Sequence, residues 1–198
     1  CVGICTEERA VGITKRLSAK RHTEQMGIDR RTVHVAMSPP EGDVRTLKQV
    51  YDGFRRAYSL AQEKGVRGGV AIFHGYRVKE DVQREFEEAD PDMGIWHWLM
   101  DVRGESWREL TYWSPHYHII GLATEVEPPS SEWVVSRLST LDPMKNLSRK
   151  DSYESVAKTA QYLLSHATYE SSDDGKGVKS VTWYGDLHPS NFTPDPTD

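Results

Sequence analysis

The pattern of apolar and polar residues in the first half of the chain predicts strand, helix and strand in that order. Alternation and β-branched residues over 31–37 predict a strand, which a proline pair ends. Apolar residues then recur at steps of three and four from an N-cap at Asp43 to Gly65, which predicts a long amphipathic helix. Residues 66–78 predict a second strand. This order is typical of an α+β fold in which helices cover a sheet.

The second half of the chain predicts a less regular series of elements. A capping box formed by Asp151 and Glu154 predicts a helix over 151–169. The remaining predicted segments are, in chain order, a solvated loop or helical insertion over 79–92, a hairpin or irregular excursion over 95–113, a strand over 112–122, a short helix over 132–138 and a last strand over 179–184. We therefore expect an α+β domain with a central antiparallel sheet of about five strands and flanking helices.

The chain length of 198 residues predicts one domain with short appendages. We expect an N-terminal extension over 1–30 that contains an amphipathic helix over 6–22, a domain over 31–188 and a C-terminal tail over 189–198. No stretch is long and apolar enough for a membrane helix, and no signal-peptide pattern opens the chain. We therefore expect a cytoplasmic protein without membrane contact.

Cys1 and Cys5 are the two cysteines of the chain and lie four positions apart at its start. Because the first residue is not methionine, we expect the sequence to be a piece of a longer or processed protein. The two thiols could be the edge of a zinc-binding module, with His22 as a distant further ligand. Two thiols without a metal role are an equally good interpretation.

The chain has 30 acidic and 25 basic residues and a formal net charge of -5. A protein that follows nucleic-acid phosphates over a large surface is usually basic, so the composition argues against such a surface. Basic residues nevertheless outnumber acidic ones over 9–31, and a second basic cluster lies over 145–158. Phosphate contacts are therefore expected only at local patches.

The strand over 112–122 carries the first candidate chemistry. Successive side chains of a strand point to opposite faces, so His116 and His118 emerge side by side on one face. Two converging imidazoles are half of a divalent-metal site. A strand with one solvated, polar face would show the same alternation, and the other segments must decide between the two interpretations.

The helix over 151–169 has two chemically different sides when its residues are placed at about 100° per residue. The side predicted to face the core consists of Val156, Ala160, Leu163, Leu164 and Ala167. The other side gathers Lys158, Tyr162, His166 and Tyr169. A tyrosine away from the apolar stripe and beside basic residues is a candidate for chemistry.

The segment Pro115-His116-Tyr117-His118-Ile119-Ile120 resembles the His-hydrophobic-His motif of the HUH endonucleases, the rolling-circle replication initiators and their relatives. Three further segments resemble family motifs in the family's order: a first-strand motif over 32–39, the strand of the third metal ligand over 68–74, and the tyrosine helix over 158–166. The resemblance is greatest to plasmid-type initiators, including archaeal plasmid and virus versions.

This resemblance implies an enzyme that nicks and rejoins single-stranded DNA at a replication origin and so initiates rolling-circle replication. It implies His74, His116 and His118 as metal ligands, and Tyr162 as the nucleophile that forms a 5′-phosphotyrosine and releases a 3′ hydroxyl. The expected ion is Mn²⁺ or Mg²⁺, with Zn²⁺ or Co²⁺ as alternatives, and three imidazoles favour the softer ions over Mg²⁺. Origin DNA and a host helicase are the expected partners, and no oligomeric state is predicted.

The chemistry gives reasons for these residue types. Neutral imidazoles leave the charge of an ion undiminished, so that it can polarise an anionic phosphodiester. A phenol with a pKa of about 10 is a weak nucleophile until cations favour the phenolate. Lys158 and His166 are the catalytic residues expected to provide that environment together with the ion. The family commonly has Lys one turn after the nucleophile, where this chain has Ser165 and His166, and often Glu as the third ligand.

Several alternatives stay open at this point. The same residues would fit an HUH-type transposase or relaxase, a metal phosphoesterase that uses water, or a non-catalytic nucleic-acid-binding module. His74 could instead be a core histidine, Tyr169 a second nucleophile and Glu154 an activator of water, while His34 is interpreted as an ordinary strand side chain. Four tryptophans could stack on unpaired bases or pack in the core: Trp96, Trp98, Trp107 and Trp113.

Overall fold

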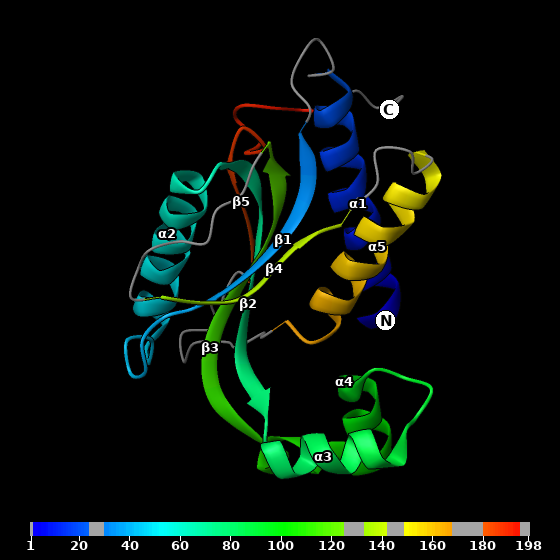
Figure 1. Ribbon diagram of the computed structural model, residues 1–198. Coiled ribbons are helices and arrows are strands. Elements are labelled where there is room, and N and C mark those ends of the chain that lie inside the picture. Colours follow the sequence, from blue (N-terminus) through cyan, green and yellow to red (C-terminus); the bar gives the residue numbers. More distant parts are fainter. Residues whose placement is uncertain (1, 24–29, 125–132, 142–148, 168–179, 195–198) are drawn as a thin grey trace.

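The computed structural model describes residues 2–23, 30–124, 133–141, 149–167 and 180–194 (Figure 1). In these parts of the chain one sheet is formed by β1 (Arg31–Ser38), β2 (Val66–Val78), β3 (Thr111–Ala123), β4 (Val134–Thr140) and β5 (Val181–Gly185). The strand order is β4-β1-β3-β2-β5, and each neighbouring pair is antiparallel. The predicted α+β fold with a central antiparallel sheet is confirmed.

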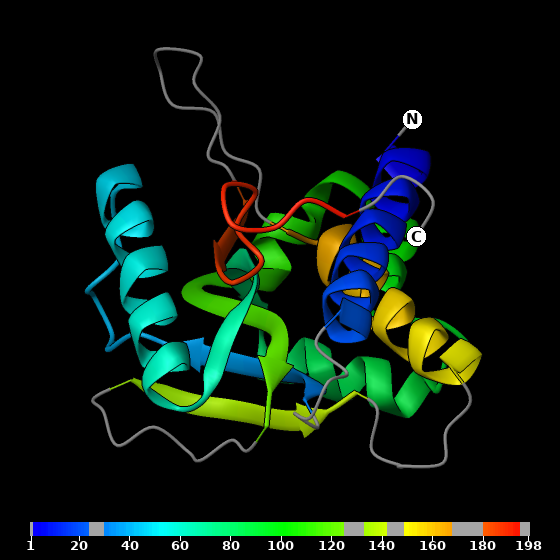
Figure 2. The ribbon, with the colours of Figure 1, turned by 90° about the horizontal axis from the view of Figure 1, so that it is seen from above.

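Helices cover both faces of this sheet (Figures 1 and 2). Helix α2 (Leu47–Glu63) covers one face, and α1 (Val2–Thr23) and α5 (Arg149–Ser165) lie side by side on the other. Residues 79–110, between β2 and β3, form a helical lobe that consists of α3 (Glu80–Ala89), α4 (Ile95–Trp98), a π-helical turn (Leu99–Arg103) and a 3-10 segment (Gly104–Leu110). None of the described helices is both long enough and apolar enough to cross a lipid bilayer.

Alternation along the central strands divides the core into two layers. Toward α2, Phe73 and Tyr117 pack against Phe54, and the ring centroids of Phe54 and Tyr117 are 5.1 Å apart. Toward α1 and α5, the adjacent positions Ile72 and Ile120 are fully buried. The alternation along each strand therefore determines which side chains face α5, and the histidines lie on that face.

Helix α1 contributes to the core, although its residues were predicted to form an appended extension. Ala10, Ile13 and Leu17 are at most 4% exposed and belong to the same apolar cluster as the inner residues of α5. Arg16 donates from Nε to the carbonyl oxygen of Leu187 at 2.8 Å and so links α1 to the segment after β5. Helix α5, which carries Tyr162, is therefore supported by α1 as well as by the sheet.

The beginning of α2 differs from the prediction, because the N-cap is Thr46 and not Asp43. The Thr46 hydroxyl accepts from the backbone N–H of Gln49 at 3.3 Å, and Gln49 Oε1 accepts from the backbone N–H of Thr46 at 2.9 Å. This reciprocal capping box satisfies two N–H groups at once. Asp43 lies in the preceding turn, where its N–H donates to the carbonyl oxygen of Pro40 at 3.2 Å.

Other element boundaries also differ from the sequence pattern. The short helix predicted over 132–138 is wrong, because residues 134–138 lie in β4, which pairs with β1. The excursion over 95–113 is helical up to Leu110, and the helical alternative for the acidic segment 79–92 is confirmed by α3. Helix α5 begins at Arg149, so Asp151 lies inside the helix and is not its cap. Cys1 and Tyr169 lie outside the described residues, as do the side chains of Cys5 and His22.

Gly53 allows α2 to approach the sheet closely. A Cβ atom at this position would overlap the hydroxyl of Tyr117, which donates a hydrogen bond to the carbonyl oxygen of Val50 at 3.0 Å. On an open helix, Gly53→Ala would stabilise the protein by about 1 kcal/mol. Here we expect it to lower the free energy of unfolding by roughly 1–3 kcal/mol, because the methyl group overpacks a rigid core.

Urea denaturation of Gly53→Ala, Tyr117→Phe and the double variant measures this effect. The double variant should be more stable than the sum of the two single effects predicts, since loss of the hydroxyl removes the overlap. Strictly additive effects would contradict the proposed contact.

Candidate metal centre

Three imidazoles converge on the face of the sheet that α5 covers. His74 of β2 lies opposite His116 of β3, and His118 follows two residues later on the same face. One ring nitrogen from each of the three residues lies within 4.8 Å of those from the other two. His74 and His116 are buried, and His118 is partly buried. The three predicted ligands thus lie close together, and they could bind a metal ion.

Hydrogen bonds determine the tautomers of two of these rings. His74 Nε2 lies 2.8 Å from the carbonyl oxygen of Leu163, and His116 Nδ1 lies 2.8 Å from the carbonyl oxygen of Ser114. Because a carbonyl oxygen only accepts, both nitrogens must carry the proton, and the other nitrogen of each ring keeps its lone pair. Ligating histidines commonly donate their second N–H in this way. Nitrogens bound to one ion lie roughly 3.4 Å apart in a tetrahedral site, so small side-chain rotations would complete it.

His34 forms a hydrogen bond with the third ring, that of His118. Sequence reasoning did not assign His34 to the site. Its Nε2 lies 2.9 Å from His118 Nδ1, and its side chain is 2% exposed. With His118 donating from Nδ1, the Nε2 atom of His118 keeps a lone pair, as the ligand atoms of the other two rings do. The register that places His34 opposite Ile120 brings it beside His118 on the same face. The only indication in the sequence was the face of its strand to which the His34 side chain points.

Replacement of His34 by phenylalanine should weaken metal binding without removing a ligand. The variant keeps a planar ring but loses the ring nitrogen that is hydrogen-bonded to His118 Nδ1 and orients that ring, so we expect the affinity for Mn²⁺ to fall about 10–100-fold. Titration calorimetry of the variant and the wild-type protein measures this change. His188→Gln, at an exposed histidine after β5, is the matched control and should bind Mn²⁺ like the wild type. Equal affinity in His34→Phe would exclude an orienting role.

Burial keeps the imidazoles of this face uncharged. Desolvation lowers the pKa of His74 and of His118 well below the usual value, and neighbouring histidines lower both further. Desolvation also lowers the pKa of His116 to about 4, although its hydrogen bond to Ser114 acts in the opposite direction. The pKa of His166 is lowered to about 3, again mainly by burial. At neutral pH these rings are uncharged, so one nitrogen of each ring keeps a lone pair that is available to a cation.

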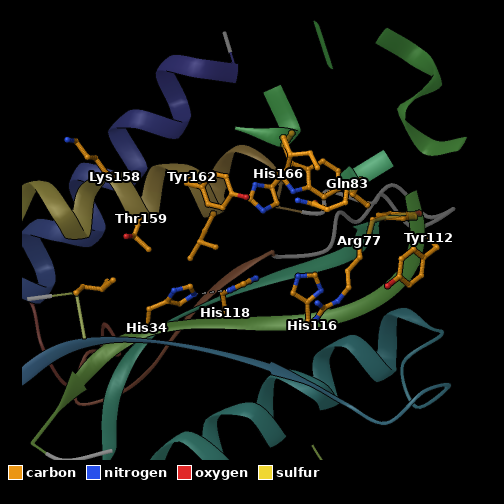
Figure 3. Close-up of a pocket in the computed structure, with 16 residues that line it drawn as sticks. His34, Arg77, Gln83, Tyr112, His116, His118, Lys158, Thr159, Tyr162 and His166 are labelled. Atoms are coloured by element: carbon orange, nitrogen blue, oxygen red, sulfur yellow. Dashed lines mark hydrogen bonds between the residues drawn. The ribbon is translucent and has the colours of Figure 1, made fainter. Parts of the chain in front are cut away.

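The C-terminal end of α5 and the residue after it place Tyr162 and His166 near the predicted metal ligands, of which Figure 3 shows His116 and His118. The His166 ring centroid lies 4.2 Å from that of His74 and 4.7 Å from that of Tyr162. In Figure 3 the Tyr162 hydroxyl points toward His166. The Tyr162 side chain is 42% exposed, so a ligand from solvent can reach it. One imidazole therefore connects the predicted nucleophile with the predicted metal ligands.

The hydrogen bonds of Ser165 indicate how His166 is protonated. The Ser165 hydroxyl donates to the carbonyl oxygen of Tyr162 at 2.7 Å, and its oxygen lies 3.3 Å from His166 Nδ1. Because the hydroxyl has one proton, which it donates to Tyr162, its oxygen accepts from His166 Nδ1–H. The His166 Nε2 atom then keeps a lone pair with which it can accept a hydrogen bond.

Lys158 lines the same pocket but is less closely associated with the cluster. It is exposed, and Figure 3 shows its side chain directed away from the histidines. Its predicted role in favouring the phenolate therefore stays a prediction. Glu154, the candidate activator of water, is exposed on α5 and is not among the described residues that line the pocket.

A pocket of about 600 Å³ lies between α5, the sheet and the helical lobe. Its polar lining includes His34, Arg77, His116, His118, Lys158, Tyr162 and His166. Among the described lining residues there is no aspartate or glutamate, although the chain as a whole has a net charge of -5. A pocket with basic groups and no acidic ones is suited to an anionic ligand.

The helical lobe forms one wall of this pocket. Trp96 stacks on His166 with ring centroids 5.0 Å apart and an interplanar angle of 12°. A Cβ atom at Gly94 would lie 3.5 Å from the Tyr162 ring, so the backbone of the lobe passes close to the predicted nucleophile. The other three candidate tryptophans make packing contacts: Trp98 with Phe86, Trp107 with Tyr76, and Trp113 with Phe73.

The site therefore combines three neutral imidazoles, an accessible phenol and a pocket with basic lining residues. The five residues predicted from the sequence, namely His74, His116, His118, Tyr162 and His166, lie close together, whereas sequence reasoning missed His34 and the contribution of the lobe. No model of a protein family, no curated protein and no solved structure matches the chain.

Proposed function

We propose that this chain nicks and rejoins single-stranded DNA through Tyr162, with a divalent metal ion held by His74, His116 and His118, and that this reaction initiates rolling-circle replication at an origin. The observation that carries the proposal is the series of ring contacts from Tyr162 through His166 to His74, at a pocket without described acidic lining residues. A nucleophilic phenol beside candidate cation ligands, in surroundings that do not repel anions, fits the attack on a phosphodiester.

The proposed reaction exchanges one phosphate ester for another. A divalent ion bound to neutral ligands would polarise the scissile phosphate with its full charge. Tyr162 Oη forms a bond to phosphorus, the bond from phosphorus to the 3′ oxygen breaks, the phenol loses its proton and the 3′ oxygen gains one. The products are a 5′-phosphotyrosine and a free 3′ hydroxyl, and attack by that hydroxyl in the reverse direction rejoins the strand.

In this proposal His166 orients the phenol of Tyr162. With a pKa of about 3, its ring is neutral and can accept a hydrogen bond from the phenol, but it is too weak a base to hold the phenol proton. A single strand is a better substrate than a duplex, because an extended backbone can enter the pocket and its bases can stack on aromatic faces such as Trp96 and Tyr112.

A random-sequence pool of fluorescent single-stranded oligonucleotides tests the proposal, since it presupposes no origin sequence. In the presence of Mn²⁺ we expect a protein–DNA adduct that survives denaturation, and EDTA should prevent it. Mass spectrometry of the digested adduct should place the nucleotide on the peptide that contains Tyr162. Cleaved DNA without an adduct would favour a phosphoesterase that uses water, and binding without cleavage would favour a non-catalytic module.

A further inference from the structure

Arg77 is a half-buried cation in the pocket that the proposed reaction does not use. It lies on β2 and lines the pocket together with His116 and His118. Its Nη2 donates to the Ser38 hydroxyl on β1 at 2.8 Å. Because β3 lies between β2 and β1, the Arg77 side chain must cross β3 to reach Ser38. The guanidinium therefore lies across the strand that carries His116 and His118, and Figure 3 shows it extending toward His116.

No acidic side chain of the described residues balances the charge of Arg77. Within the part of the chain that the structure describes, its guanidinium has no ion-pair partner, and the Ser38 hydroxyl accepts from one of its five N–H donors. Taking such a group out of water without a counter-ion is unfavourable. A divalent cation at the nearby histidines would add to this excess of positive charge. An anionic ligand that contacts both cations would stabilise the arrangement.

We propose that Arg77 binds the phosphate that occupies the three-histidine site, so that the guanidinium and the ion hold the phosphate oxygens from two sides. This inference rests on the proposed function, because a DNA strand is what brings a phosphodiester to this site. The planar fork of a guanidinium matches two oxygens of one phosphate, whereas a lysine in the same place would act as a point charge. A free phosphate ion presents the same oxygens, and the test below separates it from DNA.

Binding of a fluorescein-labelled thymidine oligonucleotide of about twelve nucleotides tests this inference. Fluorescence anisotropy is measured on protein that also carries Tyr162→Phe, in EDTA and in Mn²⁺, at several KCl concentrations. Arg77→Met should weaken binding about tenfold or more. It should also reduce the slope of log affinity against log salt by about 0.7, the value for one phosphate contact on a single strand. Arg77→Lys should restore the slope but not the full affinity, because it returns the charge without the fork.

Two control variants separate phosphate binding from other roles. Arg84→Met removes an exposed arginine of α3 that does not line the pocket, and it should change neither affinity nor slope. Ser38→Ala removes the acceptor and keeps the guanidinium, so the slope should stay unchanged. Parental affinity and slope in Arg77→Met would overturn the proposal. Equal losses in Arg77→Met and Ser38→Ala would also overturn it, because they would assign Arg77 to a structural link between β2 and β1 across β3.

The remaining outcomes are also decisive. If a thermal melt shows that Arg77→Met does not fold, the test uses Arg77→Lys instead. An affinity of Arg77→Lys for the oligonucleotide equal to that of the parent protein then overturns the proposal. Inorganic phosphate should displace the oligonucleotide less well from Arg77→Lys than from the parent protein. If inorganic phosphate competes equally well in the parent and in Arg77→Lys, and all variants bind the oligonucleotide with the same affinity, Arg77 does not hold the DNA phosphate. The binding assay does not depend on DNA cleavage. If no adduct forms, the proposed nicking reaction is refuted, but the proposed contact between Arg77 and a phosphate is not.

Discussion

Tyr162→Phe should reduce the covalent adduct with single-stranded DNA to background, while the wild-type protein forms it in Mn²⁺. The substitution removes one oxygen atom, and that atom is the one that would form the bond to phosphorus. The phenyl ring keeps its contact with His166, whose centroid lies 4.7 Å away, so the pocket should keep its shape. Denaturing gel electrophoresis measures the adduct, and anisotropy should show that the variant still binds the oligonucleotide.

Tyr112→Phe is a matched control for this variant. Tyr112 is also a tyrosine of the pocket lining and is 46% exposed, against 42% for Tyr162, but it lies on β3 and not on α5. It should form adduct at the wild-type level. Full adduct formation by Tyr162→Phe would refute the assignment of the nucleophile. DNA cleavage that survives Tyr162→Phe without any adduct, but disappears in His116→Ala, would identify water as the nucleophile.

The residues that could be identified from the sequence are those whose geometry is local. His116 and His118 share a face because strand side chains alternate, and Tyr162 and His166 share a face because they lie one helical turn apart. Neither relation depends on the rest of the fold. His74 could be added because the order of the motifs resembled a family pattern, and its position opposite His116 agrees with that assignment.

The residues that were missed depend on strand register and on long side chains. His34 reaches His118 only through the pairing of β1 with β3, and Arg77 reaches Ser38 only because β2 and β1 are separated by a single strand. Strand β4 was missed for a related reason. Its pairing with β1 determines its conformation, whereas its local pattern indicated a helix. Non-local pairing cannot be deduced from the periodicity of one segment.

The part of the helical lobe over 95–110 was also beyond local reasoning, whereas α3 agrees with the helical alternative for 79–92. Its aromatic residues are too closely spaced to show a clear helical or strand period, and its helices are short, since α4 has four residues. The lobe is held by its own apolar cluster around Val82, Trp98 and Leu99. Its contact with His166 through Trp96 joins two segments that lie seventy positions apart, and only the folded chain shows that both border one pocket.

Acidification of the metal-free protein should destabilise it strongly between pH 6.5 and 4. Burial lowers the pKa of His116 to about 4 and that of His166 to about 3, and it lowers the pKa of His74 and His118 in the same direction. In the unfolded chain each imidazole titrates at a pKa of about 6.5. Below that pH the unfolded state therefore binds more protons than the folded state, so stability is complete above pH 6.5 and falls as the pH falls.

The size of this effect makes it easy to measure. At pH 5, His116 and His166 should each have lost about 2 kcal/mol of stabilisation, and His74 and His118 add to the loss, against a typical total of about 5–15 kcal/mol. Urea denaturation at a series of pH values measures the slope. His116→Gln should reduce the slope by up to about 1.4 kcal/mol per pH unit, and His188→Gln, at an exposed position, is the control.

Mn²⁺ links the acid sensitivity to the metal centre. An ion that binds the neutral rings of the folded state stabilises that state, and protons compete with it for the same lone pairs. We therefore expect Mn²⁺ to move the acid unfolding midpoint of the wild-type protein to lower pH, and to have a much smaller effect on His116→Gln. A free energy of unfolding that does not change between pH 6.5 and 5 would show that the four rings are not buried as neutral groups. The protein could instead show the steep acid slope while Mn²⁺ leaves its unfolding midpoint unchanged. This result would support burial of the histidines as neutral groups but would exclude them as ligands of Mn²⁺.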